Sequence, residues 1–316
     1  MTLRRSASFS VALALAVPLS PAMRSVRMPP TTIEHRSTHE GCSPATASAP
    51  LVGTVPHVGR LRWVTPTTLQ IDDSASTLWN TEVHGLSLGP VTRQDHDPRG
   101  DPFDLTIPAV DAARAPVLLR NRATGNTSTI ANVHVQDVAP DRPVMLIDAG
   151  LSAFVEVDLA TLRHGRTFNG FNTASPVWAA SYSLSGRTIV VQGRTSLTLF
   201  NTHNARLRGT ITRPDLIDTW RLSPDEHFIV VAENGTITVI DAFTLKTIWS
   251  TQIEHHAIST AVDDNASASV SGGCRWTMFD PHGFRARSIS IDGVVAPDGR
   301  HIARSNHDNT YVYRLS

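Results

Sequence analysis

At 316 residues, the chain is long enough for one large domain or two ordinary ones. Apolar residues make up 41% of the sequence and charged residues 18%, which is typical of a globular protein with a sizeable core and excludes a disordered chain. Lysine plus arginine number 28, and so do aspartate plus glutamate, so no net charge draws the protein to nucleic acid or to an anionic membrane. We therefore expect neither of these partners.

Residues 1–22 have the pattern of a secretion signal. Two arginines precede an apolar run from Ser8 to Val17, which has the length of a signal core and is too short to cross a bilayer. Cleavage before Met23 would leave a secreted or periplasmic protein. Translation that starts at Met23 or Met28 would instead give a cytoplasmic protein.

Residues 23–49 are rich in Pro, Ser, Thr and Ala and lack apolar periodicity, which predicts a flexible linker. Cys42 lies in this linker and Cys274 in a strand-like segment. Two cysteines are too few for a disulfide framework or a cysteine-rich zinc site. A bridge between them would require the leader to fold back onto the domain.

Residues 50–316 carry short apolar runs separated by Gly, Asp, Asn or Pro, which is an all-β pattern. The clearest unit, from Asp218 to Gln252, contains the four strand-like runs DTWRLSP, HFIVVAEN, TITVIDAFT and KTIWSTQ. The same order of parts returns about every 40 residues, which is typical of β-propeller blades. In four successive units, the third strand-like run carries Asp158, Asn201, Asp241 and Asp280 at the equivalent place.

We predict seven blades, with six as the alternative because the segment from Phe103 to Val133 shows no fourth strand. The last unit supplies only three strands before Ser316. The strand-like segment that opens at Pro50 is therefore predicted to supply the missing outer strand and to close the ring, since closure removes exposed sheet edges.

Several turns carry a resemblance to a known repeat class. The motifs SPDE at Ser223, APDG at Ala296 and APDR at Ala139, with NGTITVID from Asn234, resemble the WD-repeat and YVTN-type β-propeller superfamily. No unit has the Trp-Asp dipeptide or the preceding His of true WD repeats, so the resemblance is to extracytoplasmic, bacterial-type members. It implies the fold and leaves the function open, because this fold hosts many activities.

In a propeller, the turns between second and third strands and the connections between blades share one face. Polar side chains expected there predict a ligand-binding channel mouth. Carboxylates and imidazoles could hold a divalent metal, as in lactonase-like propellers. No pair has a metal-ligand spacing on a rigid element, so we expect solvated binding loops without metal, cofactor or catalytic residues. The residues are Asp148, Arg194, Asp215, Asp218, Glu233, Asn234, Glu254, His255, His256, His307 and Asp308.

Other repeated residues are explained by the fold. The aspartates that end the third strands are expected to fix turns by bonding to backbone amides. Trp63, Trp178 and Trp220 fall on first strands and are expected to pack between blades. The sequence therefore predicts a monomeric, non-catalytic module that binds a protein or a small polar ligand. The alternative is a propeller enzyme, either a metal-dependent lactonase-type hydrolase or a quinone-dependent dehydrogenase.

Overall fold

We describe the fold from a computed structural model. The residues that it describes are 49–55, 60–63, 68–72, 77–80, 85–87, 103–106, 117–121, 124–130, 133–150, 153–170, 177–291, 293–305 and 309–315.

Every regular element assigned in this part of the chain is a β-strand, and these strands form successive antiparallel sheets. The early strands are β2 (Arg60–Trp63), β3 (Thr68–Asp72), β4 (Thr77–Asn80) and β5 (Gly85–Ser87), then β6 (Phe103–Thr106), β7 (Val117–Asn121) and β8 (Thr127–Ile130). The middle strands are β9 (His134–Val138), β10 (Val144–Gly150), β11 (Ala153–Asp158), β12 (His164–Phe168), β13 (Val177–Tyr182), β14 (Thr188–Gly193), β15 (Ser196–Asn201) and β16 (Leu207–Thr212). The late strands are β17 (Ile217–Leu222), β18 (Phe228–Glu233), β19 (Thr236–Asp241), β20 (Thr247–Gln252), β21 (Ser259–Val262), β22 (Ala268–Gly272), β23 (Arg275–Phe279), β24 (Arg285–Ile289), β25 (Val294–Val295), β26 (His301–Ser305) and β27 (Thr310–Arg314).

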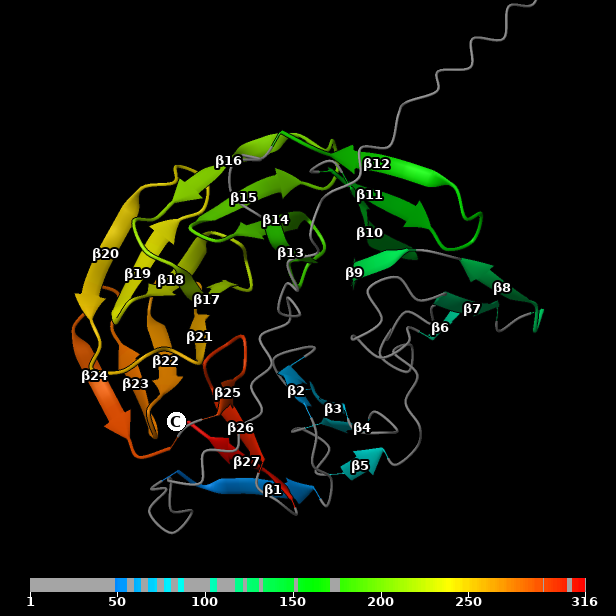
Figure 1. The fold of residues 1–316 in the computed structure, drawn as a ribbon. Helices are drawn as coiled ribbons and strands as arrows, with labels where there is room; N and C mark the ends of the chain where they lie inside the picture. The colour runs from blue at the N-terminus through cyan, green and yellow to red at the C-terminus, as the bar shows by residue number, and fades with distance from the viewer. Residues whose placement is uncertain are drawn as a thin grey trace, which may run out of the picture.

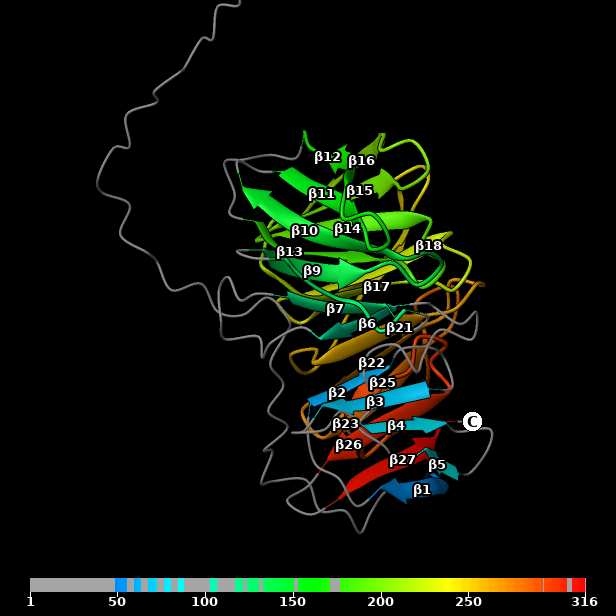
Figure 2. The same cartoon turned by 90° about the vertical axis from the view of Figure 1, so that its right-hand side faces the viewer.

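The sheets stand side by side around a ring, as Figure 1 shows from one face and Figure 2 from the side. Five sheets have the simple order of four consecutive strands, from β2–β5 and β9–β12 to β21–β24. The chain is therefore an all-β propeller, as the repeats predict. The described residues contain seven sheets, while the number of blades in the whole chain stays a prediction.

Each inner hairpin forms because its strands are apolar on both faces and joined by a tight turn. In β18 and β19, Phe228 pairs with Asp241 and Glu233 with Thr236, without a register shift. The turn residue Asn234 has φ 40° and Gly235 has φ 74°, as the common two-residue hairpin turn requires. Both faces of such a hairpin are buried because another blade stacks on each side.

The ring is closed by β1 (Leu51–Val55), which pairs antiparallel with β27. Thr54 lies opposite Tyr311, and Val55 lies opposite Thr310. The predicted closing strand is confirmed. Figure 1 shows the earliest described strand, in blue, beside the last one, in red.

The hydrophobic core lies between the blades. One cluster joins Val230, Val239 and Trp249 of one blade to Val270 and Phe279 of the next. The aromatic side chains in such clusters bury large areas, at roughly 25 cal/mol for each Å² of apolar surface. Stacking of neighbouring sheets is therefore the main source of stability.

Two of the three tryptophans on first strands pack between blades, as predicted. Trp63 is buried and donates from Nε1 to the carbonyl oxygen of Val294 at 2.8 Å. Trp220 donates from Nε1 to Oε1 of Gln192, in the preceding blade, at 2.9 Å. The side chain of Trp178 lies outside the described residues.

Within the described ranges, no helix is long and apolar enough to span a bilayer.

Candidate functional site

The aspartates that end the third strands fix turns. Oδ1 of Asp241 accepts hydrogen bonds from the backbone amides of Phe243 at 2.9 Å and Thr244 at 2.7 Å. Asp158 and Asp280 accept from backbone amides two to four residues later in the same way. The bonds to Phe243 and Thr244 lower the pKa of Asp241, with the amide of Thr244 as the largest cause. The turn interpretation is confirmed, and these aspartates belong to the fold.

We call the end of the blades that carries the second-to-third-strand turns and the connections between blades the upper face. Five predicted residues of this face lie together with one that was not predicted, Arg213. Arg213 donates from Nε to Oε1 of Glu233 at 2.6 Å and from Nη2 to Oγ1 of Thr238 at 3.2 Å. We call the set Arg213, Asp215, Asp218, Glu233, Asn234 and His256 the upper cluster.

The remaining members of the upper cluster are held by weaker contacts. Asn234 donates from Nδ2 to Oδ2 of Asp215 at 3.3 Å. Nδ1 of His256 lies 3.9 Å from Oδ2 of Asp218, with the imidazole almost fully exposed. The backbone of Asn234 also hydrogen-bonds to Asp218. Three carboxylates therefore meet one guanidinium and one exposed imidazole.

Two carboxylate oxygens of the upper cluster are buried without a hydrogen-bond partner among the described residues. They are Oε2 of Glu233 and Oδ2 of Asp218. The side chain of Glu233 is only 4% exposed and that of Asp218 is 27% exposed. Burial raises the pKa of Asp218, and the charge of Glu233 adds to the increase while His256 opposes it. The cluster is therefore short of positive charge.

The other predicted residues are spread around the upper face. Asp148 accepts from the amide of Gly150 at 2.7 Å, and its Oδ2 lies 3.9 Å from Nδ1 of His134, on the neighbouring strand of the same blade. Arg194 accepts through its carbonyl oxygen from the amide of Ile217 at 3.1 Å. These two residues do not join the upper cluster.

Glu254 forms an exposed ion pair with Arg275 at 2.5 Å and with Arg285 at 3.1 Å. His255 contacts the carbonyl oxygen of His256 at 3.3 Å. Gly272 lies against this connection, since a Cβ there would be 2.0 Å from the carbonyl oxygen of His256. His307 and Asp308 lie outside the described residues.

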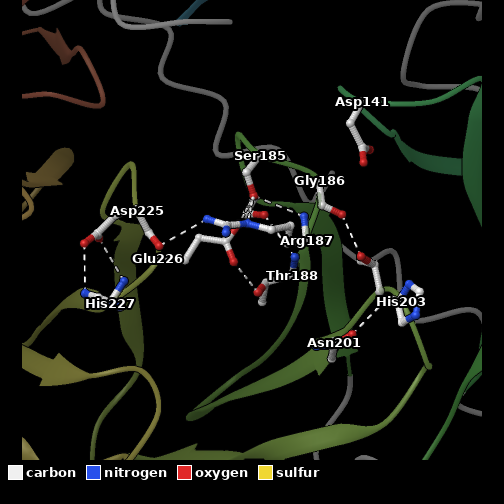
Figure 3. Close-up of polar contacts among 12 residues, drawn as sticks. Asp141, Ser185, Gly186, Arg187, Thr188, Asn201, His203, Asp225, Glu226 and His227 are labelled. Atoms are coloured by element: carbon white, nitrogen blue, oxygen red, sulfur yellow. Dashed lines mark hydrogen bonds and ion pairs between the residues drawn. The ribbon is translucent and has the colours of Figure 1, made fainter.

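The opposite, lower face carries the first-to-second-strand turns, where no contact between blades was predicted. Figure 3 shows that Glu226 reaches from its turn to the turn of the preceding blade. Its carboxylate accepts from the hydroxyl of Ser185 and, at 2.6 Å, from the hydroxyl of Thr188. Arg208 donates from Nη1 to Oγ1 of Thr188 at 2.7 Å. We call Ser185, Thr188, Arg208 and Glu226 the Glu226 latch.

Glu226 holds an unusual backbone conformation. Its φ is 68°, close to the φ of 74° at Gly186 and 72° at Gly299, which stand at the same place in the turns of two other blades. A residue with a side chain is strained there by about 1–2 kcal/mol. The next blade has Ala266 at this place, with φ 65°, so glycine is not required there. At Glu226 the bonds of the latch offset the strain.

A second network joins the preceding pair of blades. Glu156 is 3% exposed and accepts from Arg142 at 2.5 Å, from Arg166 at 3.2 Å and from the hydroxyl of Tyr182 at 3.0 Å. Burial, followed by the charge of Glu156, raises the pKa of Tyr182 far above its usual range. For Arg142, burial opposes the charge, but the hydrogen bond and the charge of Glu156 outweigh it and raise the pKa. The network therefore keeps Arg142 charged at the interface.

The turn Ser223–His227 contains the three residue types of a hydrolytic triad in the wrong geometry. The hydroxyl of Ser223 donates to Oδ1 of Asp225 at 2.6 Å, and Nδ1 of His227 lies 2.9 Å from Oδ2 of the same carboxylate. The carboxylate thus stands between the hydroxyl and the imidazole, whereas a triad needs the imidazole beside the hydroxyl. Ser223 is also buried, so this set stabilises the turn.

No group of three or more His, Cys, Asp or Glu side chains suited to a metal ion occurs within the described residues. Cys274, in the turn before β23, is disulfide-bonded. Cys42, the only other cysteine of the sequence, lies outside the described residues.

Sequence reasoning missed Arg213, Arg208 and Glu156, because each acts across a blade interface on a residue that no spacing rule connects to it. Glu226 carried a usable signal. The turns SLSG, SPDE and APDG align, and they place a glutamate where the others have glycine. A side chain at a glycine position of a repeat indicates a specific contact.

The comparisons with known proteins agree with the fold. No protein-family model matches the chain, and no curated protein is similar to it. The crystal structure of the Myceliophteria thermophila Cps50 (Swd1) β-propeller domain is similar over 85% of this chain and 100% of that chain, with a TM-score of 0.59 and 12% identity. A crystal structure of the mitotic checkpoint complex is similar over 98% of this chain and 99% of that chain, with a TM-score of 0.54 and 12% identity. At this identity the likeness shows the fold alone.

Proposed function

We propose that the protein is a secreted or periplasmic, non-catalytic binding module whose upper cluster accepts a cationic group of its ligand, such as an arginine side chain. The observation that carries the proposal is the pair of buried carboxylate oxygens, on Glu233 and Asp218, that have no hydrogen-bond partner in the described chain. A buried anionic oxygen without a partner loses about 1–3 kcal/mol or more of hydrogen-bond free energy. A ligand with several N–H donors would recover it.

The fold itself does not need these carboxylates. The position of Glu233, at the end of its blade's second strand, is occupied by Gly193 and Gly272 in the two neighbouring blades. Those blades form the same sheet without an acidic side chain. The raised pKa of Asp218 reflects burial and the nearby negative charge of Glu233. A guanidinium group supplies planar, paired donors that match carboxylates and keeps its charge when buried.

The cluster also has an exposed entrance on the side of Asp218. The His256 imidazole, whose side chain is 83% exposed, is the group that lies over Oδ2 of Asp218. Rotation of this side chain costs little, because no short hydrogen bond holds it in the described structure. Arg213 holds the first oxygen of Glu233 and leaves the second oxygen for the ligand.

Two observations support export of the protein. The N-terminal sequence has the charged start and apolar run of a signal. Cys274 is disulfide-bonded, and disulfides persist in oxidising compartments outside the cytosol. Sequencing of the mature N-terminus tests this part, with Met23 as the expected first residue and Met1 as the result that contradicts it.

Participation in a complex is supported by the similar structures. One of them is by its printed name a complex, the mitotic checkpoint complex. We therefore propose that the partner of this chain is a protein that presents a cationic side chain.

Calorimetric titration with Nα-acetyl-arginine amide tests the cationic site, with the acetyl-citrulline amide as the uncharged control of the same shape. We expect the arginine compound to bind and the citrulline compound not to bind. Glu233→Gln and Asp218→Asn should each weaken binding at least about tenfold, while Glu254→Gln, on an exposed ion pair of the same face, should leave it unchanged.

Equal binding of the two compounds, or unchanged affinity in both variants, would refute the proposal. A rise of several degrees in melting temperature with calcium or zinc, abolished by Glu233→Ala, would favour a metal-dependent enzyme instead. Bound metal at a hundredfold excess over its dissociation constant stabilises a fold by about 2.7 kcal/mol, so the effect is measurable.

A further inference from the structure

Among the described residues, the sheet β6–β8 ends at a strand without an outer neighbour. Its order is β6, β7, β8. In the other six sheets of the described chain, the third strand in sequence is covered by a fourth, which is β5, β12, β16, β20, β24 or β1. Only three residues lie between Ile130 at the end of β8 and His134 at the start of β9, too few to turn back as a covering strand.

The register shows which backbone groups face outward. The amide of Asn121 donates to the carbonyl oxygen of Asn126 at 2.8 Å, and Leu119 lies opposite Ser128. Since hydrogen-bonded and non-hydrogen-bonded pairs alternate in an antiparallel ladder, Ser128 bonds to β7. The N–H and C=O groups of Thr127 and Thr129 therefore point away from the sheet.

This edge lacks the features that protect the real outer strands. The outer strands β12, β16, β20 and β24 each pair through a register shift, and three of them carry arginines. Such shifts and charges discourage further pairing. β8 reads Thr-Ser-Thr-Ile, with no charge, glycine or proline, and pairs with β7 without a shift. Its residues favour strand structure.

The intact blades show what chemistry fits this edge. In three of them a threonine on the third strand bonds to a hydroxyl on the fourth: Thr198 to Thr210 at 3.2 Å, Thr238 to Ser250 at 2.9 Å and Thr277 to Ser288 at 3.3 Å. In three outer strands the residue after the Ser or Thr is apolar and buried. It is Ile211 in β16, Ile289 in β24 and Phe168 in β12. On β8 the equivalent residue is Ser128, which, like Thr238, lies two places beyond the pair that closes its hairpin. Its neighbours Thr127 and Thr129 are exposed.

We propose that β8 is a strand-addition site, where an extended segment of a partner protein pairs with Thr127 and Thr129 and completes the blade as its fourth strand. The segment would carry Ser or Thr followed by an aliphatic or aromatic residue. A precedent lies in the same molecule, because β1 completes another blade from the far end of the chain. Main-chain bonds would give affinity, and the side-chain pair would give specificity.

The small size of the edge selects a flexible segment over a second copy of the chain. Stable interfaces between folded proteins bury about 1,200–2,000 Å². A four-residue strand offers much less when two rigid propellers meet rim to rim. An extended segment avoids this limit because it follows the strand without a second rigid surface to clash. The site is separate from the upper cluster, so the two proposals stand or fall independently.

The test uses the full chain and a fluorescent peptide with the sequence of this protein's own outer strand from Arg206 to Arg213. A peptide with proline in place of the residue that corresponds to Thr210 is its control. We expect the first peptide to bind and the second not to bind. Hydrogen exchange should show that the amides of Thr127 and Thr129 exchange rapidly in the free protein and become protected when the peptide binds.

Two variants separate backbone pairing from side-chain contact. Thr129→Pro removes an outward N–H, which an edge strand tolerates, and should weaken binding at least about tenfold. Thr129→Val keeps the N–H and should weaken it less. Melting temperatures of both variants check folding. Undiminished binding by a folded Thr129→Pro would overturn the proposal. The proposal would also be overturned if the amides of Thr127 and Thr129 are already protected in the free protein and become exposed when residues 24–48 are deleted.

Discussion

Replacement of Glu226 gives the sharpest test of how the blades are held together. In Glu226→Ala the hydroxyls of Ser185 and Thr188 lose their acceptor. Arg208 loses a nearby carboxylate but keeps its hydrogen bond to Thr188 and its contact with the ring of Phe243. A hydrogen bond to a charged group contributes about 1.5–3 kcal/mol. Two such bonds give an expected loss of about 3–6 kcal/mol in the free energy of unfolding.

A glycine at the same position separates this loss from the backbone strain. Glu226→Gly loses the same bonds but relieves the positive φ of 68°, which is worth about 1 kcal/mol. We therefore expect Glu226→Gly to be more stable than Glu226→Ala by about that amount, although glycine normally destabilises folded chains.

Urea unfolding followed by tryptophan fluorescence measures both changes, and an unchanged slope m would show that the unfolded state is the same. Glu254→Ala, which breaks an exposed ion pair, is the control and should leave the melting temperature nearly unchanged. The reasoning is refuted if Glu226→Ala unfolds at the wild-type urea concentration, or if Glu226→Gly is the less stable of the two variants.

Three further predictions follow from the ring and from two shifted pKa values. Deletion through His57 should lower the melting temperature far more than deletion through Ser48, because only the longer deletion removes the strand that pairs with β27; equal melting temperatures would argue against closure by β1. Asp218→Asn should stabilise the protein at pH 7, because burial raises the pKa of this carboxyl in the folded state. Folding favours the protonated carboxyl, so the stability advantage of the variant should shrink as the pH falls through that raised pKa. Chemical denaturation at several pH values measures this advantage, and a constant difference would contradict the prediction. Burial against Trp63 lowers the pKa of His301 below 6.5; Arg300 and Arg314 add to this effect and Asp298 opposes it. The stability that comes from neutral His301 is complete above pH 6.5 and is lost as the pH falls from there through the lowered pKa. The melting temperature of His301→Phe should therefore change less with pH in that window than the melting temperature of the wild type.

The repeat made most of the fold predictable, because the same pattern of strands and turns recurs in each unit of the sequence. The period gave the blades, and the incomplete last unit gave the closing strand, which the pairing of β1 with β27 confirms. The turn roles of Asp158, Asp241 and Asp280 followed from local chemistry, and they are confirmed by amides within four residues.

Contacts between blades could not be predicted in the same way. Glu233 was a candidate from its place in the repeat, but its partner Arg213 lies in the connection from the preceding blade, where no periodicity constrains it. The latch between Ser185 and Glu226 likewise spans 41 positions and depends on how one sheet is rotated on the next. Of the predicted upper-face residues, His307 and Asp308 lie outside the described part, so their role stays a prediction.

The pairing of β1 with β27 also sets the order of events during synthesis. Leu51 finds its partner Tyr313 only when nearly the whole sequence has been made. At about 5–20 residues per second, the first strand waits on the order of 13–50 seconds. Contacts between such distant residues form slowly in any case, because a long loop must close. During this delay the nascent chain has an open ring and no finished last blade, a state that is looser than the native one. The export that we propose would require the chain to pass a translocation channel before it is compact, and late closure of the ring is compatible with this requirement.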